Sequence, residues 1–302
     1  MKVFYADHFV LPLPQGHRFP MSKYSLLRSR VSSFDGIEMH EAPVALKEQL
    51  LLAHTSEYVD RVCLGQLTHA EQREIGFPWS MEMVERSRRS AGATIAACRT
   101  AWIDGVAANL AGGTHHAYAD KGSGFCVFND AAIAARTIQQ DLFPILGRKC
   151  QVAIIDLDVH QGNGTASILK DDKSIFTLSI HGEKNFPFRK ESSDLDIGLP
   201  DGCSDDLYLS SLSQALKELE QLFVTDLVVF LAGADPHEGD RLGRLSLSIE
   251  GLKQRDETIL NWCSLRRLPL AITMAGGYGH NIEDTVDVHA QTINIAMGYV
   301  WI

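Results

Sequence analysis

The sequence predicts an α/β protein built on a mostly parallel β-sheet that helices cover on both faces. From about residue 82 onward, short apolar runs typical of buried strands alternate with segments of helical periodicity. The composition is that of an ordinary globular protein, with 45% hydrophobic and 22% charged residues among 302. No run of about 18 apolar residues occurs, so we expect no membrane span.

The predicted elements follow one another in a regular order. Residues 82–104 predict a long helix, because small and apolar residues recur along it. After the short apolar run 106–110, buried strands alternate with further helical patterns, and Ser204 and Ser248 are suitable N-caps for the last two helices. The strands are predicted at 152–158, 175–180, 226–235 and 269–277, and the helices at 129–140, 205–223 and 249–264.

The first 80 residues are the least regular part of the chain. They are rich in proline and contain only short helical patterns, at 45–53 and 56–63. We find no repeat, low-complexity tract or linker, and so expect a single domain over residues 1–302. A basic cluster at 86–89 lies on the predicted long helix, where we expect it to form a solvated face.

Charge and cysteine content limit the functional classes. The formal net charge of −10 argues against a broad nucleic-acid-binding surface. The six cysteines are scattered without a C-x-x-C pair, which favours a reduced cytoplasmic protein over a disulfide framework. Asp7 and His8 interrupt the apolar N-terminal run, which makes it a poor signal peptide. We therefore expect a cytoplasmic protein that binds neither nucleic acid nor a membrane directly.

Polar clusters stand at the points where the predicted strands end. In chain order they read GGTHH, DLDVHQGNG, SIHGE, GADPHEGD and AGGYGHN. Ligands of open α/β sheets bind outside the carboxyl ends of the strands. Five polar clusters at five such ends therefore predict one shared site, and this is the main indication of an enzyme.

Asp158 and His160 are the first candidates for a metal site. Residues two apart on a strand point to the same side, so these two could grip one cation. Asp235, at the tip of another predicted strand, could supply a third ligand. Two carboxylates and one imidazole leave a coordination position open, as a catalytic metal requires. Taken alone, these acids could equally cap loops or pair with arginines.

His115 and His116 are candidates for proton transfer, because imidazole titrates near neutral pH. Asp156 and Asn163 flank the metal motif and could each bond one imidazole from behind, setting its tautomer and orientation. Taken alone, adjacent histidines are more often surface or loop-packing residues.

Tyr278 and Phe125 are candidates for substrate contacts. Glycines surround Tyr278, whose hydroxyl could donate a hydrogen bond to a developing oxyanion. Phe125, after Gly124, could lie against an aliphatic substrate stem. Alternatively, Tyr278 could be an aromatic residue packed in a turn, and Phe125 could be an ordinary core residue. The glycine patterns match neither a dinucleotide fingerprint nor a phosphate-binding loop.

Together these motifs resemble the histone deacetylase superfamily, which includes bacterial acetoin-utilisation and acetylpolyamine deacetylase relatives. Five stretches match in the order of the family and span about 112–281: GGTHHAYADKGSGFCVFND, AIIDLDVHQGNGTA, TLSIHGEKNFP, LAGADPHEGDRLGRLSLS and AGGYGHN. Weaker similarity covers 53–60 and 86–97, and the stretches RSAGATI and GDRLGRLSLS are most similar to the class IV type. The resemblance implies an arginase–deacetylase fold with a central parallel sheet of about eight strands.

The resemblance also implies two cations. One Zn²⁺ per chain would be held by Asp158, His160 and Asp235, and Fe²⁺ suits the same ligands. A structural monovalent cation, usually K⁺, would lie behind the zinc. Its ligands would be Asp156, Ser179 and the backbone carbonyls of Asp158, His160 and Ile180.

Catalytic roles follow from the same resemblance. His116 would act as general base and then as general acid, with Asn163 orienting it. His115, oriented by Asp156, would stay an electrostatic partner, and Tyr278 would polarise the acyl carbonyl. Some members have a second Asp where this chain has Asn163, and since Asn carries no charge, His116 should be less basic here.

Substrate contacts are implied at Gly124, Phe125 and Leu242, with Phe125 lining a narrow tunnel. Members best known for acting on peptides have a rim Asp near the position of Gly76, so the resemblance implies that the usual contact with a peptide backbone is absent here. Members that prefer polyamines tend to have an acidic gatekeeper near the position of Leu242. The apolar Leu242 argues against a polyamine substrate, but Glu238 is close enough to keep this alternative open.

The sequence thus predicts a zinc-dependent hydrolase of linear amides that removes an acyl group, expected to be acetyl, from an amine such as an acyl-lysine side chain. An acetylpolyamine or other small-molecule amide deacetylase is the first alternative. A binuclear manganese ureohydrolase fits less well, because Gly162 stands where a further acid would be needed. A catalytically silent acyl-binding module would be expected to have lost a ligand, the base or the tyrosine, and all are present. Acyl length, amine carrier, metal identity and oligomeric state stay open.

Overall fold

The computed structural model describes residues 1–299, whose strands form one eight-stranded sheet in the order β2-β1-β3-β8-β7-β4-β5-β6. Every neighbouring pair of strands is parallel. The predicted α/β class and the expected number of strands are confirmed. The strands are β1 (Lys2–Tyr5), β2 (Glu38–Glu41), β3 (Val106–Asn109), β4 (Val152–Asp156), β5 (Ile175–Gly182), β6 (Leu195–Leu199), β7 (Leu227–Leu231) and β8 (Leu270–Thr273).

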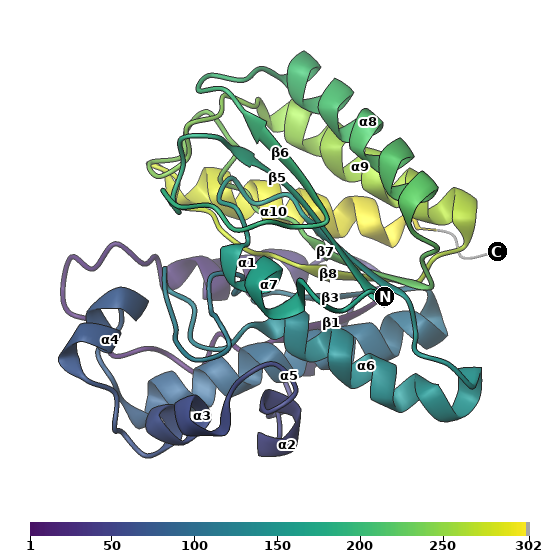
Figure 1. The fold of residues 1–302 in the computed structure, drawn as a ribbon. Coiled ribbons are helices and arrows are strands. Elements are labelled where there is room, and N and C mark those ends of the chain that lie inside the picture. Colours follow the sequence, from purple (N-terminus) through teal and green to yellow (C-terminus); the bar gives the residue numbers. More distant parts are fainter. Residues whose placement is uncertain (300–302) are drawn as a thin grey trace.

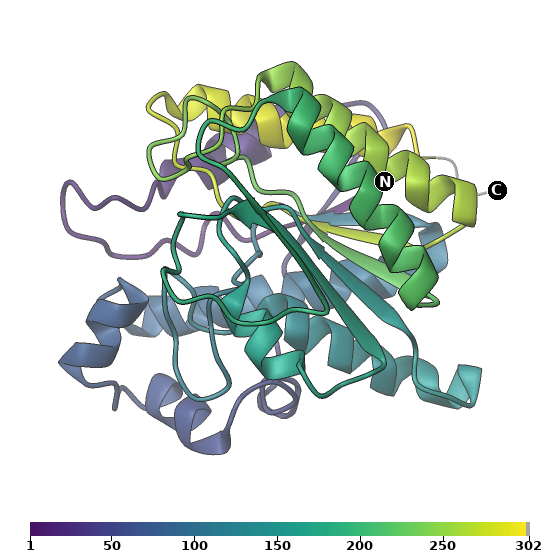
Figure 2. The ribbon, with the colours of Figure 1, turned by 45° about the horizontal axis from the view of Figure 1, so that its top comes forward.

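Helices cover both faces of the sheet (Figures 1 and 2). Helices α2 to α7 lie on one side, and α1 packs with α8, α9 and α10 on the other. Each layer closes its own apolar core against the sheet. The helices are α1 (Ser22–Val31), α2 (Lys47–Leu50), α3 (Ser56–Cys63), α4 (His69–Ile75), α5 (Met81–Asp104), α6 (Asp130–Leu146), α7 (Asn163–Leu169), α8 (Asp205–Leu222), α9 (Ile249–Arg266) and α10 (Ile282–Met297).

The central strands are buried along their whole length, which explains their unbroken apolar runs. All five residues of β4 and of β7 are buried, as expected for strands with helices on both faces. The predicted runs 226–235 and 269–277 were too long, because the strands end at Leu231 and Thr273. The residues beyond these ends form loops at the carboxyl edge of the sheet, where the polar clusters lie.

The four long helices predicted are present as α5, α6, α8 and α9, although α6 continues to Leu146. Ser248 caps α9 by accepting a hydrogen bond from the Gly251 amide, whereas the Ser204 side chain makes no capping bond to α8. Across residues 1–299, every helix is too short or too polar to span a bilayer.

The basic cluster of α5 is not the solvated face that we expected. Arg86 is buried and donates hydrogen bonds of 3.1 Å to the carbonyls of Ala6 and Phe9. Its guanidinium also lies 4.2 Å from the ring centroid of Tyr24. The cluster therefore attaches the irregular N-terminal segment to the helix layer, because buried backbone carbonyls need donors that only another segment can supply.

Candidate active site

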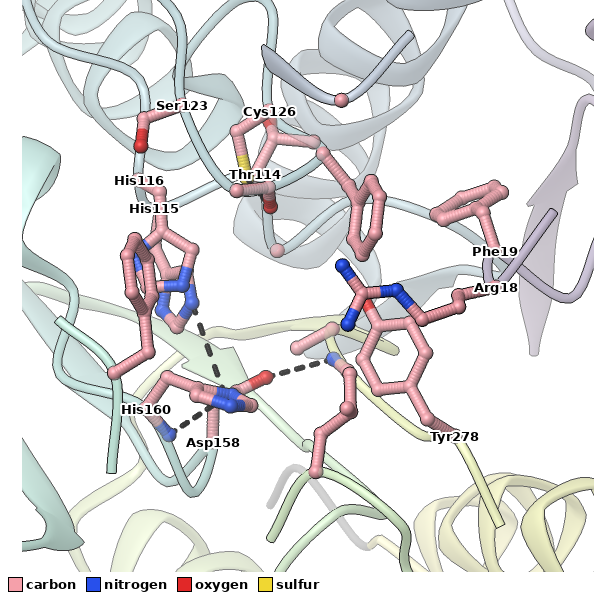
Figure 3. A pocket seen from close by; sticks show the side chains of 18 of the residues that line it. Arg18, Phe19, Thr114, His115, His116, Ser123, Cys126, Asp158, His160 and Tyr278 are labelled. Carbon is pink, nitrogen blue, oxygen red and sulfur yellow. Dashed lines mark hydrogen bonds and ion pairs between the residues drawn. The ribbon is translucent and has the colours of Figure 1, made fainter. Parts of the chain in front are cut away.

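The loops that follow β3, β4, β5, β7 and β8 meet at one edge of the sheet and line a cavity of about 970 Å³. The N-terminal segment and α4 complete its wall. Within the cavity, His115, His116, Asp158 and His160 lie on one side and Tyr278 lies on the other (Figure 3). Residues of GGTHH, DLDVHQGNG and AGGYGHN thus line one site, and Asp235 of GADPHEGD lies beside it, whereas residues 179–183 do not line the cavity.

Asp158, His160 and Asp235 form a buried cluster at the floor of the cavity. Their ligand atoms lie within 4.8 Å of one another. The His160 Nδ1 is 2.9 Å from Asp158 Oδ1 and 3.3 Å from Asp235 Oδ2. Asp158 and His160 follow β4, and Asp235 follows β7, its neighbour in the sheet. Adjacent parallel strands therefore bring together ligands that are far apart in sequence.

The chemistry of this cluster fits a divalent cation. Asp235 Oδ2 is buried and has no hydrogen-bond partner among the described residues. Burial, and next the charge of Asp158, raise the pKa of the Asp235 carboxyl to about 7. A cation between the two carboxylates would offset both the burial of the Asp235 charge and its repulsion by Asp158. Gly276 provides the space, because a Cβ there would lie 1.9 Å from Asp235 Oδ2. The donor set of two carboxylates and one imidazole suits Zn²⁺ or Fe²⁺.

The side chains expected to bind a monovalent cation lie on two paired strands. Asp156 ends β4 opposite Ser179 of β5, and Ile180 follows Ser179 on that strand. All three residues are buried. The Asp156 Oδ1 accepts a hydrogen bond from the Asp158 amide at 3.2 Å. This cluster thus adjoins the Asp-His-Asp cluster through the backbone of β4.

Each histidine of the pair after β3 has one buried partner. His115 Nδ1 lies 2.6 Å from Asp156 Oδ2, and His116 Nδ1 lies 2.7 Å from Asn163 Oδ1. Since both partners accept hydrogen bonds, each Nδ1 carries the proton and each Nε2 is left for other contacts. The His115 Nε2 lies 3.8 Å from Asp158 Oδ1, which joins the pair to the Asp-His-Asp cluster.

The two histidines differ in basicity. Burial lowers the pKa of His115, but the carboxylates of Asp156 and Asp158 outweigh it and raise the pKa to about 9. Burial and the neighbouring positive charges of His115 and His160 hold the pKa of His116 well below its ordinary value. His115 therefore favours the charged form and His116 the neutral form, which is the form that can accept a proton.

The loop that carries the histidine pair is held by residues that sequence reasoning missed. The Asp130 carboxylate accepts hydrogen bonds from the amides of Gly113 at 3.0 Å and Thr114 at 2.7 Å. His54 Nε2 accepts from the Asn129 amide at 2.9 Å. The Asn129 side chain in turn donates to the carbonyl of Ala117 at 3.1 Å. Their signal was present in the stretches AHTSEYVD and GSGFCVFND, where they were not singled out.

Tyr278 is held by the loop that follows β7. Its amide donates to Asp240 Oδ2 at 2.6 Å, and its carbonyl accepts from Arg241 Nε at 2.8 Å. Burial, followed by the influence of Tyr24, raises the pKa of the Tyr278 phenol well above its ordinary value. The hydroxyl therefore stays protonated and able to donate a hydrogen bond.

Lys23 supports the same tyrosine from behind and was not singled out in the sequence. Its side chain is buried, and its Nζ lies 3.3 Å from the Ala275 carbonyl and 3.4 Å from that of Gly277. The ammonium also lies 5.4 Å from the ring centroid of Tyr278. Ala275 has a positive φ of 48°, so the loop adopts a strained backbone there that these bonds help to hold.

Two aromatic side chains flank the approach to the floor. Phe125 lies 5.9 Å from Tyr278 between ring centroids. Phe186, to which no sequence motif assigned a role, lies 4.9 Å from His116 between ring centroids. Gly124 lies between these walls, since a Cβ there would be 2.7 Å from the His116 ring. Phe125, Phe186 and Gly124 all line the cavity, and the substrate tunnel expected at Phe125 stays a prediction.

Leu242 and Gly76 also line the cavity. The Leu242 carbonyl accepts a hydrogen bond from Asn185 Nδ2 at 2.7 Å. Gly76 ends α4 with a φ of 88°, and a Cβ there would lie 2.8 Å from the Phe125 ring. A side chain at position 76 would therefore displace the Phe125 ring.

A buried Asp-His-Asp cluster, a pair of histidines of opposite basicity and a protonated tyrosine lie around one cavity, an arrangement that suits metal-assisted hydrolysis. The sequence pattern of the histone deacetylase domain matches residues 17–293. The chain belongs to the histone deacetylase family.

Relatives with sequence and structural similarity agree with this assignment. The chain is 44% identical over 292 residues to an uncharacterised protein of Picosynechococcus sp., covering 95% of each. It is 32% identical to histone deacetylase 2 of Arabidopsis thaliana, over 87% of this chain and 70% of the relative. It is 30% identical to the acetoin utilization protein AcuC of Bacillus subtilis, over 82% of this chain and 66% of AcuC.

Solved structures share the fold. The crystal structure of an HDAC homologue from Aquifex aeolicus superimposes with a TM-score of 0.82 at 23% identity, covering 98% of this chain and 84% of that one. An HDAC homologue complexed with SAHA gives a TM-score of 0.83, also at 23% identity, over 98% of this chain and 83% of the homologue. The arginase–deacetylase fold expected from the sequence is therefore confirmed.

Proposed function

We propose that this chain is a metal-dependent deacylase that hydrolyses the amide between an acyl group, expected to be acetyl, and a primary amine such as a lysine side chain. One observation carries the proposal. The Asp-His-Asp cluster lies at the floor of one cavity, whose lining also includes the paired histidines, Tyr278 and the aromatic side chains of Phe125 and Phe186. General base, electrophilic site and hydrogen-bond donor are thus available to the same carbonyl.

Asp158, His160 and Asp235 would hold the metal ion, which we take to be Zn²⁺, with Fe²⁺ as the alternative. When bound, such an ion polarises a carbonyl oxygen and lowers the pKa of water. K⁺ is proposed for the neighbouring site. Its ligands would be Asp156, Ser179 and the carbonyls of Asp158, His160 and Ile180.

The chain's own residues would divide the proton transfers and charge stabilisation. The neutral imidazole of His116 would take a proton from the attacking water and return it to the leaving amine. His115, kept positive by Asp156, would stabilise negative charge that develops nearby. The Tyr278 hydroxyl would donate a hydrogen bond to the oxygen of the tetrahedral intermediate.

The apolar walls would bind the alkyl stem of the substrate. Phe125 and Phe186 would lie on opposite sides of a methylene chain and keep water out of the passage, while Gly124 leaves room for that chain. Leu242 would contact the carrier at the mouth. We propose that residues 1–302 act as one domain, since β1 near the N-terminus pairs in the same sheet as β8. A cytoplasmic location stays a prediction that the six free thiols support.

The test is amine release by purified, metal-loaded protein from an acetyl-lysine peptide, a long-chain acyl-lysine peptide and an acetylpolyamine. Metal content is first verified by mass spectrometry. Turnover of the acetyl-lysine peptide, abolished by a hydroxamate chelator, is the expected result. Turnover of the acetylpolyamine alone would replace the proposed carrier. No turnover of any substrate by the metal-loaded protein would refute the deacylase and favour a silent acyl-binding module.

A further inference from the structure

The mouth of the cavity carries an unusual excess of positive charge. Five exposed basic side chains line it, and we call them the cationic rim: Arg18, Arg73, Lys184, Arg241 and Arg244. Among the described residues, the acids that line the cavity are Glu74 and the buried Asp158 of the floor. The rim contrasts with the whole chain, whose formal net charge is −10.

The rim cations are only partly neutralised. Within residues 1–299, no hydrogen bond or ion pair engages the guanidinium of Arg18 or of Arg73. Glu74, beside Arg73, pairs with Lys121 at 2.7 Å. Both of these arginines are therefore left with unused donors at the mouth, and Arg18 points into the cavity (Figure 3).

The remaining three cations are also under-compensated. Lys184 and Arg244 share a single carboxylate, that of Asp201, at 3.9 and 3.1 Å. Arg241 donates its Nε to the Tyr278 carbonyl, which carries no charge. The mouth thus keeps several positive charges close to the opening of the passage.

Such a rim favours an anionic carrier and disfavours a cationic one. Clustered charge at the edge of a low-dielectric cleft concentrates oppositely charged substrates and repels those of like charge. Guanidinium groups match carboxylates in geometry as well as in charge. An acylated polyamine would bring ammonium groups against these arginines and the lysine.

The distribution of the rim points to an extended carrier. Its members come from the N-terminal segment, α4, the loop after β5 and the loop after β7. Anionic groups on both sides of the acylated amine would therefore find partners at once. Phe188, 86% exposed and 6.4 Å from Phe186 between ring centroids, adds an apolar contact beside the passage.

Resting on the proposed deacylase function, we propose that the substrate is an acylated lysine within an acidic peptide segment, selected by the cationic rim. Carboxylates flanking the lysine would pair with Arg18 and Arg73 on one side and with the loops after β5 and β7 on the other. The acyl-lysine stem would enter between Phe125 and Phe186.

The experiment compares kcat/KM for one acyl-lysine peptide with flanking Glu, flanking Gln or flanking Lys. Free Nε-acetyl-lysine and an acetylpolyamine complete the panel, and all are measured at low and high ionic strength. We expect the Glu peptide to exceed the Lys peptide by about tenfold or more at low salt, with the ratio falling as salt screens the rim. Equal values for the three peptides, or preference for the acetylpolyamine, would overturn the inference.

Charge reversal at the rim gives the second arm. Arg73→Glu and Arg18→Glu should each lower the Glu-to-Gln peptide ratio by about fivefold. Lys217→Glu, an exposed change on α8 outside the cavity, is the matched control and should leave the ratio unaltered. An unchanged ratio in both rim variants would overturn the inference. A free acetyl-lysine rate equal to that of the Glu peptide would overturn the peptide carrier. Absence of turnover throughout would instead refute the deacylase itself.

Discussion

The floor of the cavity and its mouth differ in how their side chains are held. At the floor, the Asp-His-Asp residues are buried, and backbone amides of neighbouring loops bind the carboxylates, as Gly276 does for Asp158 at 2.7 Å. At the mouth, the rim side chains are exposed, and Arg18 and Arg73 have no partner among the described residues. Floor groups are thus preorganised, while Arg18 and Arg73 at the mouth have no protein partner that fixes their side chains.

The floor would therefore determine the rate of the chemical step, and the mouth would determine substrate selectivity. Preorganised dipoles and ligands stabilise charge without reorganisation, so substitutions there should reduce turnover by large factors. Solvated side chains gain little from one new ion pair, because each loses conformational entropy and competes with water. Substitutions at the mouth should therefore change substrate preference by small factors and leave the chemical step intact.

The largest expected effect is loss of the metal ligand His160. In His160→Ala the cluster keeps two mutually repelling carboxylates and loses its imidazole. Metal affinity should fall by more than about 100-fold, beyond the effect of losing an outer hydrogen-bond partner. Metal content after gel filtration measures it, with exposed His40→Ala as control. Retention of one metal ion per chain by His160→Ala would remove His160 from the ligand set.

The next effect is expected at Tyr278. The change Tyr278→Phe keeps the ring and removes the hydroxyl that would donate to the oxyanion. We expect kcat to fall by about 10² to 10³ with metal content and melting temperature preserved. Tyr5→Phe, on β1, serves as the control for loss of a phenol. Full kcat in Tyr278→Phe would show that the carbonyl is polarised without it.

A smaller effect should follow at Lys23, one layer behind the floor. Lys23→Met removes the donor to the carbonyls of Ala275 and Gly277 but keeps the apolar stem. As a positioning residue that does not line the cavity, Lys23 should affect kcat by about tenfold and KM little. A loss of stability with kcat unchanged would assign Lys23 a purely structural role.

Acid should reduce the stability that His54 contributes to the loop carrying the histidine pair. Burial lowers the pKa of His54 to about 4, below its ordinary 6.5. Protonation then favours the unfolded chain, so this contribution is complete above pH 6.5 and is lost as the pH falls toward 4. We expect wild type to lose about 2 kcal/mol more than His54→Gln between pH 7 and 5. Urea unfolding at pH 7 and pH 5 measures the loss for each protein. Equal losses of unfolding free energy in wild type and His54→Gln would contradict this expectation.

The smallest effect is expected at Phe188, on the exposed mouth. Phe188→Ala should raise KM for a peptide about threefold and leave kcat unchanged, since truncating one exposed aromatic removes little buried area. Phe143→Ala, 54% exposed on α6, is the matched control. A large fall in kcat for Phe188→Ala would contradict the view that the mouth affects substrate binding but not the chemical step.

Much of the floor could be predicted because its residues follow buried strands, which appear in the sequence as unbroken apolar runs. The apolar runs of β4 and β7 end directly in Asp158, His160 and Asp235, so parallel pairing alone predicts their meeting. The catalytic roles of these residues stay predictions. The class IV resemblance and the carrier stay predictions as well.

Other parts were hidden because their pattern depends on distant partners. The edge strand β2 reads EMHE and is largely exposed, so it shows no apolar run. The buried face of α10 includes Thr285, His289 and Thr292, which weaken its apolar periodicity. The roles of Lys23 and the rim arginines depend on segments that are distant in sequence. Arg86 was expected in solvent because its backbone partners are distant as well.

The most direct test of the account is a metal titration of chelator-stripped wild-type protein, following release of amine from an acetyl-lysine peptide. We expect no turnover without metal and a linear rise in rate that stops at one equivalent of Zn²⁺ per chain. Full activity of the metal-free protein, or no activity at any metal content, would contradict it.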